Sequence, residues 1–193
     1  MKLKYKKIIP VAILVLLFFN TCIYHKITHL DSTELEWVNN QYVGEEKSFT
    51  SGNGIIDTAI ITEVKVENSY SPFNSNPNVS SEYIAMAYVD YKIMHNGDSI
   101  DGSFSIEKHD NSEPICFHAN LGDLYAFNVK QRPSKLWINN VPYDDCLIFD
   151  ERNSRVSPSY SNDNPIISLI WSKSKGLIQY KFKDGTLFSV KDR

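Results

Sequence analysis

Apolar and polar residues alternate along most of the chain after about residue 46. The segment "YIAMAYVDYKIMHNGDSIDGSFSIE" (83–107) places apolar side chains at every second position on both sides of an Asn-Gly pair. This alternation predicts half-buried strands, and Asn-Gly between two such strands is a strong signal for a two-residue hairpin turn. No helical period is sustained over the roughly 11 to 18 residues that indicate a long helix. The pattern predicts an all-β chain.

A type I′ turn at Asn96 and Gly97 fixes which residues face each other across this hairpin. Counting outward from the turn, one face of the hairpin pairs Ile93 with Ile100, Tyr91 with Gly102, Val89 with Phe104, and Ala87 with Ile106. The other face pairs Met94 with Ser99, Lys92 with Asp101, Asp90 with Ser103, and Tyr88 with Ser105. Because a one-residue slip would mix the apolar and polar sets, the turn and the pattern specify the same register.

The C-terminal segment "GLIQYKFKDGTLFSVKD" (176–192) predicts a second hairpin with a different turn. A two-residue loop at Asp184 and Gly185 would bring a serine into the apolar face. A three-residue loop with Gly185 in the left-handed conformation avoids this. It pairs Phe182 with Thr186, Tyr180 with Phe188, and Ile178 with Val190.

Further turns are predicted at residues 52–54 and at Asn139 and Asn140. Two stretches rich in Ser, Asn and Pro, 68–82 and 151–165, separate the strand-like segments, because these residues favour turns and break ladders. About ten strands then follow one another in sequence. This order predicts an antiparallel meander that curls into a half-barrel or closes into a barrel, with a two-sheet sandwich as the alternative.

The first 22 residues form a segment of another kind. Lysines at positions 2, 4, 6 and 7 precede an apolar run at 8–19, which is short for a membrane-spanning helix and typical of an export signal. Two interpretations stay open: cleavage with lipid attachment at Cys22, or retention as a membrane anchor. Both tether the chain to a membrane and place its body on the periplasmic or cell-surface side. The expected organisation is a signal or anchor at 1–22, a linker at 23–34, and one all-β domain at 35–193.

Charge excludes one class of partner. The chain has 20 Lys and Arg against 23 Asp and Glu. Four of the lysines lie in the first seven residues, which leaves 16 cations against 23 acidic residues and a net charge of about −7 for the rest. Nucleic-acid binding requires clustered cations, so a nucleic-acid partner is not expected.

The remaining cysteines, Cys116 and Cys146, form an even pair if Cys22 carries a lipid. An exported protein can join such a pair in a disulfide. The alternative is that both are small apolar core residues, as free cysteines commonly are.

Three blocks of sequence carry a resemblance to a known group. They are "LEWVNNQYVGEEKSFTSGNGIIDTAIITEV", "LWINNVPYDDCLIFD" and "WSKSKGLIQYKFKDG". The chain resembles uncharacterised exported lipoproteins of Bacteroidota that end in a hairpin of the type YSKxxGLIxYxxKDG. The resemblance implies an all-β lipoprotein of the periplasm or cell surface, and it implies no catalytic residue.

Few residues suggest chemistry. The stretch "HDNSEPICFH" gathers His109, Asp110, Cys116 and His118, but its spacing fits no familiar zinc or nucleophile motif. The acidic residues of "PYDDCLIFDE" (142–151) are too close along one strand to face each other across a glycosidase cleft. No phosphate loop, GxSxG or HExxH motif is present. We therefore predict no catalytic, metal or cofactor site, and a hydrolase is the weakest alternative.

A non-catalytic binding module is the favoured prediction. Exposed loops on a β scaffold often carry recognition, and the two polar stretches contain Tyr70, Phe73 and Tyr160, whose rings suit a glycan, a peptide or another small ligand. The alternative is a structural or assembly lipoprotein that pairs with another envelope protein through an open sheet edge.

Overall fold

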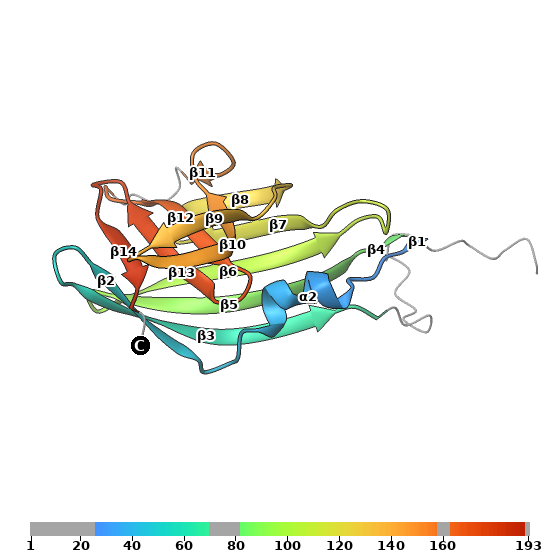
Figure 1. Ribbon diagram of the computed structural model, residues 1–193, viewed down its shortest axis with the longest axis horizontal. Helices are drawn as coiled ribbons and strands as arrows, with labels where there is room; N and C mark the ends of the chain where they lie inside the picture. Colours follow the sequence, from blue (N-terminus) through green and yellow to red (C-terminus); the bar gives the residue numbers. More distant parts are fainter. Residues whose placement is uncertain (1–25, 70–81, 158–162, 192–193) are drawn as a thin grey trace, which may run out of the picture.

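The computed structural model describes residues 26–69, 82–157 and 163–191. Most of this part of the chain lies in one antiparallel sheet of 12 strands (Figure 1). A short parallel pair, β1 (Lys26–Ile27) with β4 (Glu82–Tyr83), and one helix, α2 (Ser32–Asn39), complete the fold. The prediction of an all-β antiparallel meander is confirmed.

The sheet has the spatial order β11-β8-β7-β6-β5-β3-β2-β14-β13-β12-β10-β9. Its strands are β2 (Glu46–Ser51), β3 (Ile56–Glu67), β5 (Ala85–His95), β6 (Asp98–Lys108), β7 (Cys116–Leu121), β8 (Leu124–Val129), β9 (Ser134–Ile138), β10 (Val141–Phe149), β11 (Arg155–Val156), β12 (Ile166–Ser172), β13 (Gly176–Phe182) and β14 (Leu187–Val190). The sheet curls so that β12 approaches β8, and Figure 1 shows the red strands lying above the long green ones. The result is a curled half-barrel.

The first and last strands of the half-barrel pair with each other, whereas two consecutive strands in the middle of the sequence do not. The first and last strands of the sheet, β2 and β14, pair with each other, as Phe188 does with Ser51. The consecutive strands β8 and β9 do not pair, and they lie towards opposite edges of the sheet. Their connection, residues 130–133, ends in Pro133, which has no N–H to donate to a ladder. The open seam therefore falls in the middle of the sequence.

Both hairpin registers predicted from sequence are confirmed. Asn96 and Gly97 have φ of 50° and 90°, and every predicted pair from His95 with Asp98 to Ala87 with Ile106 is present. The polar face carries an ion pair between Lys92 and Asp101 at 3.3 Å.

In the C-terminal hairpin, Gly185 has φ of 94°, and the Phe182 N–H donates to the Thr186 carbonyl at 2.9 Å. Tyr180 pairs with Phe188, as predicted. The expected pair of Ile178 with Val190 is not formed, because the ladder of β13 with β14 ends at Gln179 and Ser189, and Ile178 lies in a separate apolar cluster. Val190, its predicted partner, packs against that same cluster.

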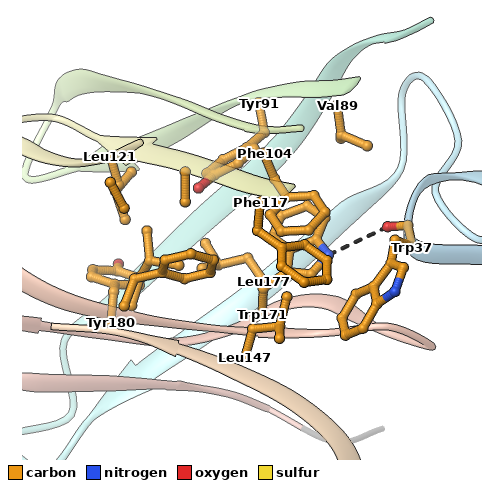
Figure 2. Packing of buried hydrophobic residues seen from close by; sticks show 14 of the residues in the cluster. Trp37, Val89, Tyr91, Phe104, Phe117, Leu121, Leu147, Trp171, Leu177 and Tyr180 are labelled. Atoms are coloured by element: carbon orange, nitrogen blue, oxygen red, sulfur yellow. Dashed lines mark hydrogen bonds between the residues drawn. The ribbon is translucent and has the colours of Figure 1, made fainter. Parts of the chain in front are cut away.

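The concave side of the sheet holds the main core (Figure 2). Phe104 and Trp171 stack across the half-barrel with ring centroids 4.2 Å apart and planes 8° apart. The indole N–H of Trp171 donates to the backbone carbonyl of Trp37 at 3.4 Å, and the Trp37 ring packs edge-on against Phe117. Helix α2 therefore closes one end of the half-barrel with a buried aromatic group.

Residues 26–34 belong to the folded domain, although the sequence suggested a linker over 23–34. Leu30 is buried in the main core, and Asp31 caps α2 in a capping box with Glu34. The Glu34 carboxylate also binds the Lys108 ammonium at 2.7 Å. The helix has only eight residues, too few for the period on which a sequence-based helix prediction depends.

The hairpin of β9 and β10 folds back over the convex side of the sheet. β10 has an irregular register between Tyr143 and Cys146, and the side chain of Asn139 at the hairpin tip donates to the Val190 carbonyl at 3.4 Å. A second apolar cluster fills the space beneath it and consists of Ile138, Tyr143, Cys146 and Ile178. Such a fold-back depends on the bulge, because bulges bend a strand locally.

Both cysteines of the body are free and buried. Cys116 lies on β7 and is 2 % exposed, and Cys146 lies in the second cluster and is 0 % exposed. The structure therefore does not contain the possible disulfide and has the two thiols as small apolar residues instead.

The segment 1–25, including Cys22, lies outside the described residues. No helix within the described ranges has both the length and the hydrophobicity that spanning a bilayer requires.

Candidate functional site

The residues that sequence suggested for ligand binding, Tyr70, Phe73 and Tyr160, lie outside the described part of the chain. The predicted structural turns at Asn96 and Gly97 and at Asp184 and Gly185 are all formed. The side chain of Asp184 accepts the Thr186 N–H at 2.7 Å, which lowers the pKa of its carboxyl.

The cluster suggested by "HDNSEPICFH" is only partly assembled. His109 and His118 each place Nε2 at 3.3 Å from the Glu107 carboxylate, which the sequence analysis did not single out. Contact with His118 is the main reason that the pKa of Glu107 is lowered. Asp110 instead binds Ser112 within its own turn.

The thiol of Cys116 is not activated as a nucleophile would be. Burial raises its pKa, and the His118 ring nitrogens face Glu107 and the Asn128 N–H. Across the described residues, no three potential ligands gather in a way that would hold a metal ion.

The carboxylates of residues 144–151 have mostly structural partners. Asp144 pairs with Lys135 at 3.3 Å, and Asp145 accepts the Ser172 hydroxyl and the Ser174 N–H, both at 2.8 Å. Asp150 binds the guanidinium of Arg152. These contacts fix turns and strand ends, and they do not form two carboxylates facing each other across a cleft.

A groove lies at the end of the half-barrel opposite α2, around the turn between β7 and β8. Its floor is formed by inward-facing apolar side chains, including Ile100, Leu124 and Phe182, and its rim by polar residues such as Asn120. This part of the groove encloses about 600 Å³. Mouths of β-barrels are common positions for ligand sites.

Tyr125 continues the groove onto the convex side of β8. It lines the mouth and also a neighbouring hollow of about 580 Å³, which has Phe127 and residues 151–155 as its other walls. We call this continuous surface the rim groove: the mouth, the rings of Tyr125 and Phe127, and residues 151–155.

The aromatic wall of the rim groove follows from strand alternation. In β8, Leu124 and Ala126 point into the core, so Tyr125 and Phe127 point outward. Their side chains are 49 % and 62 % exposed, and their ring centroids lie 6.3 Å apart with planes only 20° apart. Phe127 also contacts the His118 ring edge-on at 4.5 Å, which limits its rotation.

The polar wall of the rim groove is a turn held by its own side chains. The Asp150 carboxylate accepts the Arg152 N–H at 3.0 Å and the Arg152 Nε–H at 2.9 Å, which lowers the pKa of Asp150. The Asn153 amide donates to the Ile148 carbonyl at 2.8 Å. Arg155 then pairs with Tyr125 as β11 joins β8. Polar groups and aromatic rings are thus fixed relative to one another.

Sequence reasoning missed this site although a signal was present. The run "LYAFNV" (124–129) alternates aliphatic residues with aromatic ones, which indicates that one of the two sets faces solvent. Binding rings were expected only in the long polar stretches. What could not be foreseen is that residues 151–155 lie beside these rings, because that depends on the pairing of β11 with β8.

No protein family, curated protein or solved structure shows a significant match to this chain. The resemblance to exported lipoproteins therefore stays a prediction. The rim groove has exposed, nearly parallel rings, an adjacent apolar mouth and fixed hydrogen-bonding side chains, which suit the non-covalent binding of a ligand with both apolar and polar surfaces.

Proposed function

We propose that this protein is an exported, membrane-tethered module that binds a glycan in the rim groove. The observation that supports it most is the pair of exposed, nearly parallel rings of Tyr125 and Phe127 beside a turn with fixed polar groups. A sugar unit has a face of C–H groups that can pack on an aromatic ring, and a periphery of hydroxyls that require hydrogen-bond partners. Both parts of this chemistry are available in the rim groove.

The two rings are suited to an extended chain. They lie at alternate positions of one strand, so each ring can pack against a successive sugar unit of the same glycan. Arg152, Asn153 and Arg155 line the hollow beside the rings and supply donors for ring hydroxyls. The mouth beyond Tyr125 extends the surface by an apolar floor with Asn120 and Asp101 at its rim.

The side chains of the rim groove are held in place before a ligand binds, which favours binding. The Asp150 turn is held by side-chain hydrogen bonds, and Phe127 is held by His118, so little freedom is lost when a ligand binds. Replacing one stacking ring by alanine is expected to weaken binding at least tenfold, which corresponds to about 1.4 kcal/mol.

Export and tethering are proposed from the N-terminal sequence. Basic residues, an apolar run and Cys22 follow one another as they do in signal peptides and lipid-attachment segments. A tethered domain would present the rim groove to glycans in the periplasm or at the cell surface.

Affinity electrophoresis tests the proposal. The full chain and the variants Tyr125→Ala and Phe127→Ala are run in native gels containing soluble β-glucan, mannan, xylan or pectin, and any polysaccharide that retards the protein is followed by calorimetry. Tyr42→Ala is the matched control, because Tyr42 is 68 % exposed in the turn after α2 and lines no part of the rim groove.

We expect retardation by at least one polysaccharide, with a loss in both rim-groove variants and none in the control. Absence of retardation by the whole panel, or equal retardation of all variants, would overturn the proposal.

A second function, assembly with another envelope protein, has one observation in its favour. β9 is an edge of the sheet, and its Trp137 is 74 % exposed, across from Pro142. Exposed edge strands are sites for the addition of a partner strand. Copurification of one defined envelope protein with the wild type but not with Trp137→Ser would favour this function, and identical copurification would contradict it.

A further inference from the structure

A second groove lies on the convex side of β12 and β13. It encloses about 710 Å³, and its lining includes Asp150, Val156, and the residues Glu151 and Ser154, which also line the rim groove. Lys181 and Lys183 line it as well. We call it the lysine groove, and the proposed glycan site makes no use of its floor or of its lysines.

The floor of the lysine groove is made of three half-buried isoleucines, Ile148, Ile167 and Ile170. Ile148 and Ile170 are partners across β10 and β12, so their side chains lie together on one face. Ile167 joins them because the ladder of β12 with β13 is irregular between Ile166 and Ser168. An apolar strip therefore faces solvent on a side of the sheet where polar residues would be expected.

The lysines of this groove lack a carboxylate partner, unlike most other lysines of the described residues. In the described ranges, seven lysines have a carboxylate oxygen at 2.5 to 3.3 Å; they are Lys47, Lys65, Lys92, Lys108, Lys130, Lys135 and Lys173. Lys181 and Lys183 have no such partner among the described residues. Lys181 lies on β13, Lys183 directly follows the end of that strand at Phe182, and both line the groove. Two uncompensated positive charges thus border the apolar strip.

The acidic side chains of the groove leave this charge largely available. Asp150 is bound to the Arg152 guanidinium, so its charge is already compensated. Glu151 is exposed on the turn that lines the groove. A ligand's negative charge would therefore be favoured on the lysine side and disfavoured at the turn.

From this arrangement we infer that the lysine groove binds an amphipathic carboxylate of the fatty-acid class. The carboxylate accepts charge-assisted hydrogen bonds from the ammonium groups of Lys181 and Lys183, and the acyl chain lies along Ile148, Ile167 and Ile170. Each methylene that is buried on this floor raises the affinity by about three- to fourfold. The charge of the carboxylate and the length of the acyl chain should therefore contribute separately to the affinity.

Calorimetry on the full chain in lipid nanodiscs tests the inference, with empty nanodiscs as the blank for partitioning. The probes are octanoate and decanoate, decanol as the uncharged chain, and hexaglutamate as a charge without a chain. The double variant Lys181→Gln with Lys183→Gln is compared with Lys65→Gln and Lys135→Gln, which removes the same charge from two exposed lysines elsewhere.

We expect saturable decanoate binding that is about tenfold stronger than octanoate binding, at least tenfold weaker in the groove variant, and unchanged in the control variant. Decanol should bind more weakly than decanoate. Equal binding of decanol and decanoate, equal loss in both double variants, or no binding beyond the blank would overturn the inference. Hexaglutamate binding as strong as that of decanoate would also overturn it and assign the groove to an acidic peptide.

This inference is independent of the glycan proposal. Tyr125→Ala and Phe127→Ala should leave decanoate affinity unchanged, since neither ring lines the lysine groove. Loss of decanoate binding in these variants would place the fatty acid in the rim groove and contradict the assignment.

Discussion

Gly102 is the position where one added methyl group should be most informative about the core. Gly102 lies opposite Tyr91 in the hairpin of β5 and β6, and the Tyr91 ring lies over it. A Cβ at Gly102 would lie 2.4 Å from Cε2, 2.6 Å from Cζ and 2.9 Å from the hydroxyl oxygen of Tyr91. The backbone at Gly102 is not left-handed, so the substitution to alanine is penalised by this contact and not by φ.

The size of the destabilisation follows from the contacts that the Tyr91 ring loses when it is displaced. The ring is 3 % exposed and packs against Trp171 with centroids 5.9 Å apart, so it cannot move away without disturbing its neighbours. Overpacking of this kind costs about 1–3 kcal/mol. Displacement also strains the hydrogen bond from the Tyr91 hydroxyl to the Asn120 carbonyl, worth about 0.5–1.5 kcal/mol. Against this, alanine is favoured over glycine in a strand by about 0.5–1 kcal/mol.

We therefore expect Gly102→Ala to lower the free energy of unfolding by about 1–3 kcal/mol. Urea unfolding followed by tryptophan fluorescence measures this, because Trp171 is buried in the core. The control is the same substitution in a Tyr91→Leu background, where leucine lacks all three clashing atoms. There, Gly102→Ala should be neutral or slightly stabilising, and the coupling between the two sites should reach about 1 kcal/mol or more. Additive effects of the two substitutions would refute the reasoning.

Three further predictions concern single groups. Gly185→Ala should destabilise the protein by about 1 kcal/mol or more, because φ is 94°, whereas Gly52→Ala, at a glycine without positive φ, should not; equal melting shifts would count against the turn. The pKa of Glu107 is lowered in the fold, so its contribution to stability is present above its ordinary pKa of 4.5 and is lost as pH falls through the folded value. The difference in melting temperature between wild type and Glu107→Gln should therefore be larger at pH 5.5 than at pH 3, and an unchanged difference would disprove the role of the carboxylate. Cys116 and Cys146 should react with a thiol reagent slowly in the native protein and completely in urea without reductant, since burial raises the pKa of Cys146 to about 11 and both are free; missing thiols in urea would indicate a disulfide.

The hairpins show what local sequence can fix. Asn96 with Gly97, and Gly185 in its three-residue loop, determine both turn type and register, because the backbone conformations they adopt are disfavoured for most other residues. Alternation of apolar residues then gives the same register independently. These two features determined the all-β class and the pairing within each hairpin.

The rim groove shows what local sequence does not determine. Tyr125 and Phe127 face solvent by alternation alone, but the turn at 151–155 joins them only through the pairing of β11 with β8. The lysine groove likewise depends on Ile167, which an irregular ladder turns outward, and on loop residues placed beside β13. Neither surface could be predicted from spacing along the chain.

The sequence by itself determined the strands, their turns and the face that each strand buries, because these depend on neighbours a few residues apart. Only the tertiary structure decided that β2 pairs with β14, that β8 and β9 separate to leave the seam open, and that α2 closes one end. The physical reason is that these choices depend on contacts between distant segments, which are settled by packing Phe104, Trp171 and Trp37 into one core. No local propensity distinguishes these long-range pairings from their alternatives.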